Sequence, residues 1–182
     1  MPTTYSPSVP ARGPLSAVVL ADIAGGLAAA RDLWQASVRH DPDGRKPVRL
    51  LATETYEVWV IGWTTGQHVR PHDHGRSAGA LVVVEGMLTE VLPEPGACPV
   101  ERVLGPGRVW RVPVGTVHDV VNRAPVPATS LHAYSPPLSS MTYYDPGTLA
   151  PVDTEAIPPT PPVLGAPAAS YLLHPAQRWG RP

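Results

Sequence analysis

The chain has 182 residues and a formal net charge of −1, with 14 Lys and Arg against 15 Asp and Glu. This length suits one folded domain, and the near-neutral charge argues against a nucleic-acid footprint or a membrane-surface patch. The single cysteine, Cys98, excludes an internal disulfide and favours a reducing compartment, so we expect a cytoplasmic protein. No apolar run approaches the ~20 residues of a membrane span. Arg12 and the PLSAVVL segment resemble the start of a signal peptide, but Asp22 interrupts the apolar run, which favours an amphipathic helix.

The first 44 residues predict an irregular arm followed by short helices. Residues 1–13 contain three prolines, and from about residue 15 to 38 apolar side chains recur at roughly helical intervals. Gly25 and Gly26 are expected to divide this segment into two helices. The sequence HDPDG at 40–44 then predicts a turn.

From residue 48 onward the pattern changes to short strands separated by Gly and Pro, with a tight turn expected at Glu85-Gly86. The predicted strands are 48–53, 56–63, 68–74, 80–85, 87–92, 101–104, 108–112, 117–121 and 130–135. Many short strands of this kind favour a mostly β barrel or sandwich.

The remainder of the chain is rich in proline, with thirteen of the 25 prolines from Pro125 onward. Because proline removes a ladder donor, we expect an irregular wrap anchored by Tyr171, Leu172 and Leu173. The predicted organisation is a single domain over 1–182, with the arm and helices in 1–44, the barrel in 45–137 and the proline-rich segment in 138–182.

Two stretches carry histidines in a pattern that indicates a metal site. The first, GQHVRPHDHGRSAGALVVVEG at 66–86, contains His72 and His74, and side chains two apart on a strand share a face. The second, GRVWRVPVGTVHDVVN at 107–122, contains His118. Three neutral imidazoles can hold iron or zinc and leave positions open for other ligands. His40, His68 and His174 belong to no such group and are interpreted as surface or packing residues.

The glycines, histidines and Pro113 of these stretches have spacings that resemble the two cupin motifs, which implies a jelly-roll barrel, or double-stranded β-helix. Many cupins add a glutamate ligand at the position of Gly79, so the inferred site has three histidines and no carboxylate. The uncompensated metal charge favours an anionic ligand such as a thiolate.

A second group, Ser130, His132 and Tyr134 in SLHAYSPPL, alternates along one predicted strand and therefore shares a face. With its spacing from His118, this segment resembles the type I cysteine dioxygenases, which are cupin thiol dioxygenases with a three-histidine iron site. The resemblance covers about residues 49–137. It implies that the three side chains form a hydrogen-bonded row ending at the metal, that Arg49 holds the substrate carboxylate, and that Trp63 lines the pocket.

The implied reaction is the iron(II)-dependent addition of both atoms of O2 to the sulfur of L-cysteine, which gives cysteine sulfinate. Thiolate and amine would bind the iron. Some family members link a cysteine at the position of Gly79 covalently to the tyrosine, so Tyr134 is expected to be unmodified here. Pro47 stands where the animal enzymes have a further tyrosine, so the resemblance implies that one contact to the substrate carboxylate is missing here.

Several alternatives remain open. The substrate could be 3-mercaptopropionate or another small thiol carboxylate, although enzymes of that kind usually have glutamine at the position of Arg49. The protein could also be a non-catalytic cupin that acts as a ligand sensor. A sensor, however, has no need of the polar row formed by Ser130, His132 and Tyr134 at the metal. Arg49 could instead form a structural salt bridge, and Tyr134 could be a core residue. The expected partners are the thiol and O2, without nucleic acid or membrane, and we expect a monomer.

Overall fold

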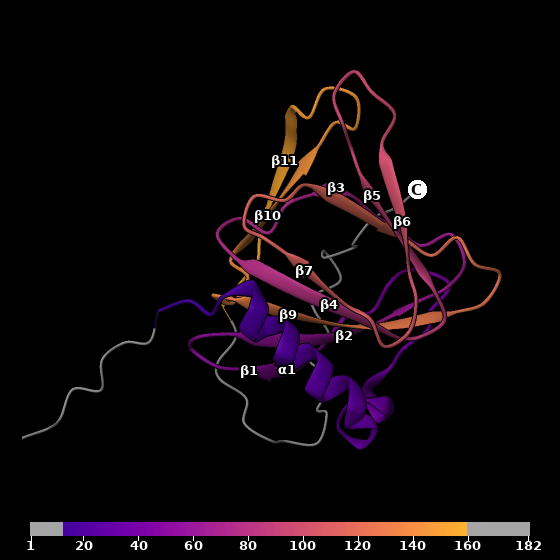
Figure 1. The fold of residues 1–182 in the computed structure, drawn as a ribbon, viewed down its shortest axis with the longest axis vertical. Helices are drawn as coiled ribbons and strands as arrows, with labels where there is room; N and C mark the ends of the chain where they lie inside the picture. Colours follow the sequence, from indigo (N-terminus) through magenta and orange to yellow (C-terminus); the bar gives the residue numbers. More distant parts are fainter. Residues whose placement is uncertain (1–12, 160–182) are drawn as a thin grey trace, which may run out of the picture.

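The computed structural model describes residues 13–159 (Figure 1), and strands dominate this part of the chain. One α-helix comes first, α1 (Ala17–Ala29), followed by the 3-10 turns η1 (Arg31–Leu33) and η2 (Gln35–Ser37). The strands are β1 (Val48–Ala52), β2 (Glu57–Trp63), β3 (His68–His72), β4 (Ala78–Glu85), β5 (Leu88–Leu92), β6 (Val100–Leu104), β7 (Val109–Val112), β8 (His118–Val121), β9 (Ala128–Ser135), β10 (Ser140–Tyr144) and β11 (Pro151–Ala156).

The strands form two antiparallel sheets that face each other. One sheet has the order β1-β2-β9-β4-β7, and the other has the order β11-β10-β3-β8-β5-β6. The ladders of the described strands make two sheets of a jelly roll rather than one closed barrel. The predicted mostly β, cupin-type architecture is confirmed in this form.

Strand β2 is buried along its whole length because both of its faces are covered. Trp59, Ile61 and Trp63 belong to the core between the sheets, whereas Val58 and Val60 belong to a second core with α1. Figure 1 shows α1 lying across the five-stranded sheet. The alternation follows from the two-residue period of a strand, and it places the aromatic side chains of β2 in the interior.

The predicted break at Gly25 and Gly26 is wrong, because α1 continues through both residues to Ala29. A Cβ at Gly25 would lie 3.4 Å from Val109 Cγ2 of β7. A methyl group at this position would make an ordinary contact with the sheet, so α1 packs directly against β7 here. Ser16 begins the helix, and its side chain accepts a hydrogen bond from the Val19 N–H.

The nine predicted strands agree with β1–β9 to within two residues at each end, and the turn at Glu85-Gly86 is confirmed by a φ of +71° at Gly86. The segment after residue 135 differs from the expectation of an irregular wrap. Strands β10 and β11 form a hairpin, and β10 pairs with β3. The prolines of this segment up to residue 159 lie in connections or at the first position of β11, where no interior ladder bond is lost.

The expected anchor residues Tyr171, Leu172 and Leu173, and also His174, lie outside the described residues. Within residues 13–159, α1 and the two 3-10 turns are all too short to cross a membrane as apolar helices.

Candidate metal centre

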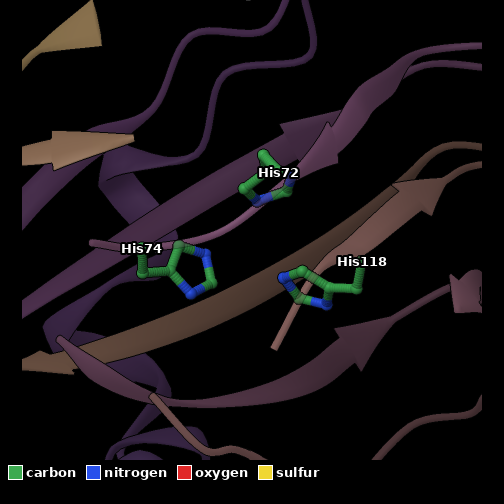
Figure 2. Close-up of side chains that lie close together, drawn as sticks. All are labelled: His72, His74 and His118. Atoms are coloured by element: carbon green, nitrogen blue, oxygen red, sulfur yellow. The ribbon is translucent and has the colours of Figure 1, made fainter. Parts of the chain in front are cut away.

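Three histidines from two neighbouring strands meet in the interior between the sheets. His72 ends β3 and is the ladder partner of His118, which begins β8, and His74 follows two residues after His72. The distances between the ring centres are 4.8 to 5.1 Å. One nitrogen from each ring lies within 4.8 Å of the others, and all three side chains are buried. Figure 2 shows the three imidazole rings converging.

Hydrogen bonds fix which nitrogen faces the centre of this group. The Nδ1–H of His72 donates to the Arg70 carbonyl at 2.8 Å, and the Nδ1–H of His118 donates to Glu90 at 2.7 Å. The Nε2 of His118 is buried with no hydrogen-bond partner among the described residues. Two of the imidazoles therefore hold their protons away from the site and leave Nε2 available as a ligand.

The electrostatics of the site favour the neutral, ligating form. Burial, and next the neighbouring His118, lower the pKa of His72 and of His74 well below the ordinary histidine value. A metal binds neutral imidazole. The three imidazoles, with the His118 Nε2 lacking a hydrogen-bond partner among the described residues, fit a divalent metal ion. Such an ion would be held by three histidines and would keep further coordination positions open for other ligands.

The opposite sheet contributes a row of polar side chains from β9. The Oγ of Ser130 lies 2.8 Å from His132 Nε2, and His132 Nδ1 lies 3.2 Å from the Tyr134 hydroxyl. The Tyr134 ring centre is 4.8 Å from that of His74. The structure therefore brings the expected row together and places its tyrosine end beside the histidine cluster.

Trp63 determines which groups donate and which accept the hydrogen bonds of this row. Its Nε1–H donates to Ser130 Oγ at 2.8 Å, and burial lowers the pKa of His132 to about 3, so this ring is neutral. The arrangement that satisfies every donor has Ser130 donating to His132 Nε2 and His132 Nδ1–H donating to Tyr134. The Tyr134 O–H is then left to donate into the cavity. Burial also raises the pKa of Tyr134, which keeps the phenol protonated.

The expected carboxylate-binding arginine lies elsewhere. Arg49 Nε is 3.1 Å from Glu57 Oε2, and the guanidinium lies 4.3 Å from the centre of the Trp59 ring. Arg49 is absent from the residues that line the cavity at the three histidines. Arg49 and Trp59 are cross-strand partners at the start of the sheet, so the indole and the buried Glu57 hold the arginine at the sheet edge.

A different arginine, Arg45, lines the cavity. Its guanidinium carbon lies 4.9 Å from the centre of the Trp63 ring. Burial lowers its pKa to about 10, which leaves it charged at neutral pH. The cavity is otherwise lined by the histidines and by largely apolar side chains: Pro47, Trp59, Ile61, Trp63, Val69, His72, His74, His118, Val120, His132, Tyr134, Leu138 and Met141. Arg45 is thus the only cavity-lining residue with a fixed charge in the described part of the chain.

Residues next to the motif histidines have structural roles. Asp73 accepts hydrogen bonds from the Gly75 N–H at 2.9 Å and from the Tyr144 hydroxyl at 2.7 Å. It therefore joins β3 to β10 and faces away from the site. A Cβ at Gly79 would lie 3.3 Å from two carbons of the Tyr134 ring. Cys98, the single cysteine, is exposed on the connection between β5 and β6. It therefore does not take the place beside the Tyr134 ring that Gly79 occupies.

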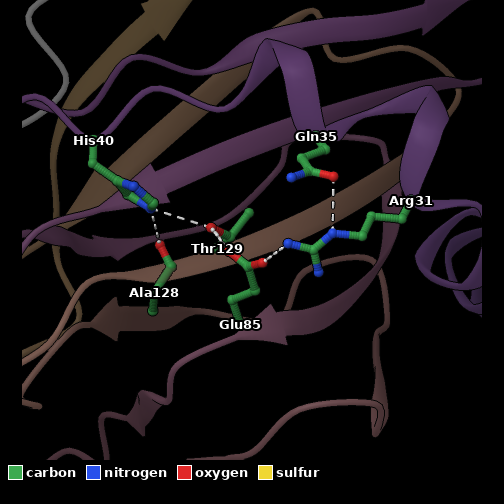
Figure 3. A network of polar contacts seen from close by, with 6 residues as sticks. All are labelled: Arg31, Gln35, His40, Glu85, Ala128 and Thr129. Atoms are coloured by element: carbon green, nitrogen blue, oxygen red, sulfur yellow. Dashed lines mark hydrogen bonds and ion pairs between the residues drawn. The ribbon is translucent and has the colours of Figure 1, made fainter.

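His40 lies outside the cavity and takes part in a separate polar network, shown in Figure 3. Its Nε2 lies 3.0 Å from the Ala128 carbonyl and 3.1 Å from Thr129 Oγ1, which also contacts Glu85. Arg31 pairs with Glu85. This network ties the segment after α1 to the first residues of β9, in agreement with a packing role for His40.

Sequence reasoning missed Arg45 and Glu90. Glu90 is fully buried on β5 two residues after Leu88, so it faces inward. A charged residue at an inward strand position is a visible signal that it contacts a buried polar group. Arg45 precedes β1 in a segment without periodicity, and its sequence gives no comparable signal.

A two-sheet jelly roll with three converging histidines defines a cupin with a metal centre. The chain belongs to the cysteine dioxygenase type I family, whose family model matches residues 19–147. This membership makes it a cupin thiol dioxygenase, and His72, His74 and His118 form a buried group that could hold its metal.

Solved structures are similar over part of the chain. The protein TT1209 from Thermus thermophilus is 24% identical, with a TM-score of 0.48, over 54% of this chain and 90% of that one. An uncharacterized conserved protein with a double-stranded β-helix domain from Klebsiella pneumoniae is 19% identical, with a TM-score of 0.49, over 69% and 94%. A sugar phosphate isomerase from the cupin superfamily, from Silicibacter pomeroyi, is 26% identical, with a TM-score of 0.46, over 56% and 65%.

Proposed function

We propose that this protein is an iron(II)-dependent dioxygenase that converts L-cysteine to cysteine sulfinate. The observation that carries the proposal is that one cavity holds the three histidines, the Tyr134 hydroxyl and the Arg45 guanidinium. A metal site, a hydrogen-bond donor and a carboxylate-binding cation are what a thiol carboxylate and dioxygen require. The expectation of a monomeric, cytoplasmic protein stays a prediction.

Arg45 is the residue that would bind the substrate carboxylate. A guanidinium can donate two parallel hydrogen bonds to a carboxylate, and such a pair is strong where water is excluded. The apolar lining of the cavity supports this role, because a low local dielectric strengthens the attraction between the two charges. Binding through Arg45 would direct the other end of a short substrate toward the histidines.

The protein would also orient the substrate and hold the hydroxyl proton of Tyr134 at a fixed place in the cavity. When bound, iron(II) supplies the redox chemistry and favours the thiolate form of the substrate. Trp63, Ser130 and His132 would hold the Tyr134 O–H so that it donates toward oxygen atoms in the cavity. Tyr134 keeps its proton at neutral pH, so it acts as a donor and not as a base.

The overall reaction balances without another co-reactant. The S–H bond of the thiol and the O–O bond of dioxygen break, two S–O bonds form, and a proton is released with the sulfinate. Sulfur loses four electrons, and the two oxygen atoms gain them. Sulfinate is the second oxidation level above the thiol.

A second candidate substrate is 3-mercaptopropionate. The sequence argument against it depended on Arg49, but Arg49 contacts Glu57 and Trp59 and does not line the cavity. Arg45 could bind either carboxylate. The cavity lining contains no carboxylate among the described residues, so selectivity for the cysteine amine would depend on the metal.

The test is oxygen uptake by the iron(II)-loaded protein with cysteine, 3-mercaptopropionate and cysteamine, together with detection of the sulfinate. We expect uptake equal to the sulfinate formed, with cysteine as the best substrate. Preference for 3-mercaptopropionate would establish the second candidate. Absence of oxygen uptake with every thiol would favour the non-catalytic cupin sensor.

A further inference from the structure

A buried carboxylate stands directly behind one of the three histidines. Glu90 is fully buried on β5, and its Oε1 accepts the His118 Nδ1–H at 2.7 Å. Its other oxygen pairs with Arg102, its ladder partner on β6. The Arg102 guanidinium also lies 4.6 Å from the centre of the Trp110 ring. Both oxygens of Glu90 are therefore engaged by fixed partners.

His118 and His72 differ in the group that accepts their Nδ1 proton. His72 donates to a neutral carbonyl, that of Arg70, whereas His118 donates to a carboxylate. A carboxylate acceptor polarises an imidazole more strongly and makes the opposite nitrogen a better donor to a metal. The orphaned Nε2 of His118 is that opposite nitrogen.

The ion pair with Arg102 accounts for only part of the negative charge at this position, because the Arg102 side chain is 35% exposed whereas Glu90 is fully buried. Burying a carboxylate is unfavourable even when it is paired, and the neutral amide oxygen of a glutamine could accept the same N–H bond. A carboxylate here is useful when a cation is bound on the far side of His118. The charge of Glu90 then partly offsets that of the metal, which three neutral histidines do not.

We propose that Glu90 is a positioning residue for the metal, which acts through His118 by fixing the Nδ1–H tautomer and strengthening the Nε2–metal bond. Arg102 keeps the carboxylate in place. This inference rests on the metal centre of the proposed function but not on the identity of the substrate, so metal binding tests it without turnover.

The experiment compares wild type, Glu90→Gln and Glu101→Gln as metal-free full-length proteins titrated with Co²⁺ alone. Glu101 lies on the neighbouring strand in an exposed ion pair with Arg123, so Glu101→Gln makes the same chemical change away from the site. We expect Glu90→Gln to bind Co²⁺ about 10- to 100-fold more weakly, with a shifted visible spectrum, and Glu101→Gln to match wild type. Thermal unfolding of the metal-free proteins reports whether each variant folds.

Nitrogen NMR of the histidine side chains in metal-free wild type gives a second measurement that needs no variant. We expect the Nδ1–H tautomer at His118. Co²⁺ affinity of Glu90→Gln within twofold of wild type, or an Nε2–H tautomer in wild type, would overturn the role of Glu90. A wild-type protein that binds neither Co²⁺ nor Fe²⁺ would overturn both this role and the metal centre. Normal Co²⁺ behaviour without oxygen uptake would instead contradict only the proposed reaction.

Discussion

The guanidinium carbon of Arg45 lies 4.9 Å from the centre of the Trp63 ring, and the N–H of the same indole donates to Ser130. Trp63 therefore contacts both the cavity's fixed positive charge and the start of the row that ends at Tyr134. The guanidinium proposed to bind the substrate carboxylate and the row that ends at the Tyr134 hydroxyl are thus held relative to each other by one rigid side chain.

Replacing Arg45 by Ala should remove the preference for substrates that carry a carboxylate. Loss of one partner of a buried charge pair costs about 2–5 kcal/mol, or roughly 30-fold to several thousand-fold in kcat/KM for cysteine. Cysteamine, which has no carboxylate, should lose much less. Steady-state kinetics with both thiols measure the ratio. Arg45→Lys should restore it only in part, because an ammonium cannot form the fork.

Arg49→Ala is the matched comparison for this experiment. We expect it to keep the ratio of cysteine to cysteamine, because Arg49 contacts Glu57 and Trp59. Collapse of the ratio in Arg49→Ala, with the ratio retained in Arg45→Ala, would show that the arginine assigned from the resemblance binds the substrate after all.

Arg49 should matter for stability. Glu57 is buried, and its oxygens are contacted by Arg49 and by the Leu138 N–H. Removing one partner of a buried ion pair costs about 3–5 kcal/mol, so Arg49→Ala should lower the free energy of unfolding in urea. The double variant Arg49→Met, Glu57→Gln should recover much of the loss. Burial already raises the pKa of Glu57, and loss of Arg49 raises it further, so the damage should lessen at lower pH.

Replacing His72, His74 or His118 by Ala should in each case abolish tight metal binding while the protein stays folded. Each substitution removes one of three ligand nitrogens from the cluster. The metal content of proteins purified under identical conditions measures the effect. His68→Ala is the control, because His68 lies on the same strand but pairs with Asp119 outside the cavity. Full metal content in any of the three ligand variants would remove that residue from the site.

Acid should destabilise the metal-free protein through its buried histidines. Burial lowers the pKa of His132 to about 3 in the folded state, against about 6.5 in the unfolded chain. Between these values only the unfolded state binds the proton, so stability falls as the pH falls. The contribution of His132 is about 1.4 kcal/mol per pH unit, or about 2 kcal/mol between pH 6.5 and 5.

Urea unfolding of metal-free wild type and His132→Gln at pH 7.5 and 5 checks this prediction. The loss of stability on acidification should be about 2 kcal/mol smaller in the variant. His72 and His74 act in the same direction in both proteins, because burial also lowers the pKa of each. An equal loss in the two proteins would mean that His132 is protonated in the folded state or is not buried.

The features that the sequence predicted depend on short-range periodicity. His72 and His74, and likewise Ser130, His132 and Tyr134, are two residues apart, so a strand places each set on one face. Arg45 precedes β1 in a segment without periodicity, so its place in the cavity has no local pattern, and the alternation of β5 indicates that Glu90 faces inward but not which distant residue it contacts. The number of prolines after residue 135 does not predict the β10–β11 hairpin, because the prolines up to residue 159 lie in the connections or at the first position of β11.

The most direct test of the account is the reaction of the iron(II)-loaded protein with L-cysteine under ¹⁸O₂, followed by mass spectrometry of the product. A thiol dioxygenase transfers both oxygen atoms to sulfur, so the sulfinate should carry two heavy atoms, with one O₂ consumed per sulfinate. A product with one heavy atom, a disulfide product, or no oxygen uptake would contradict the proposed reaction.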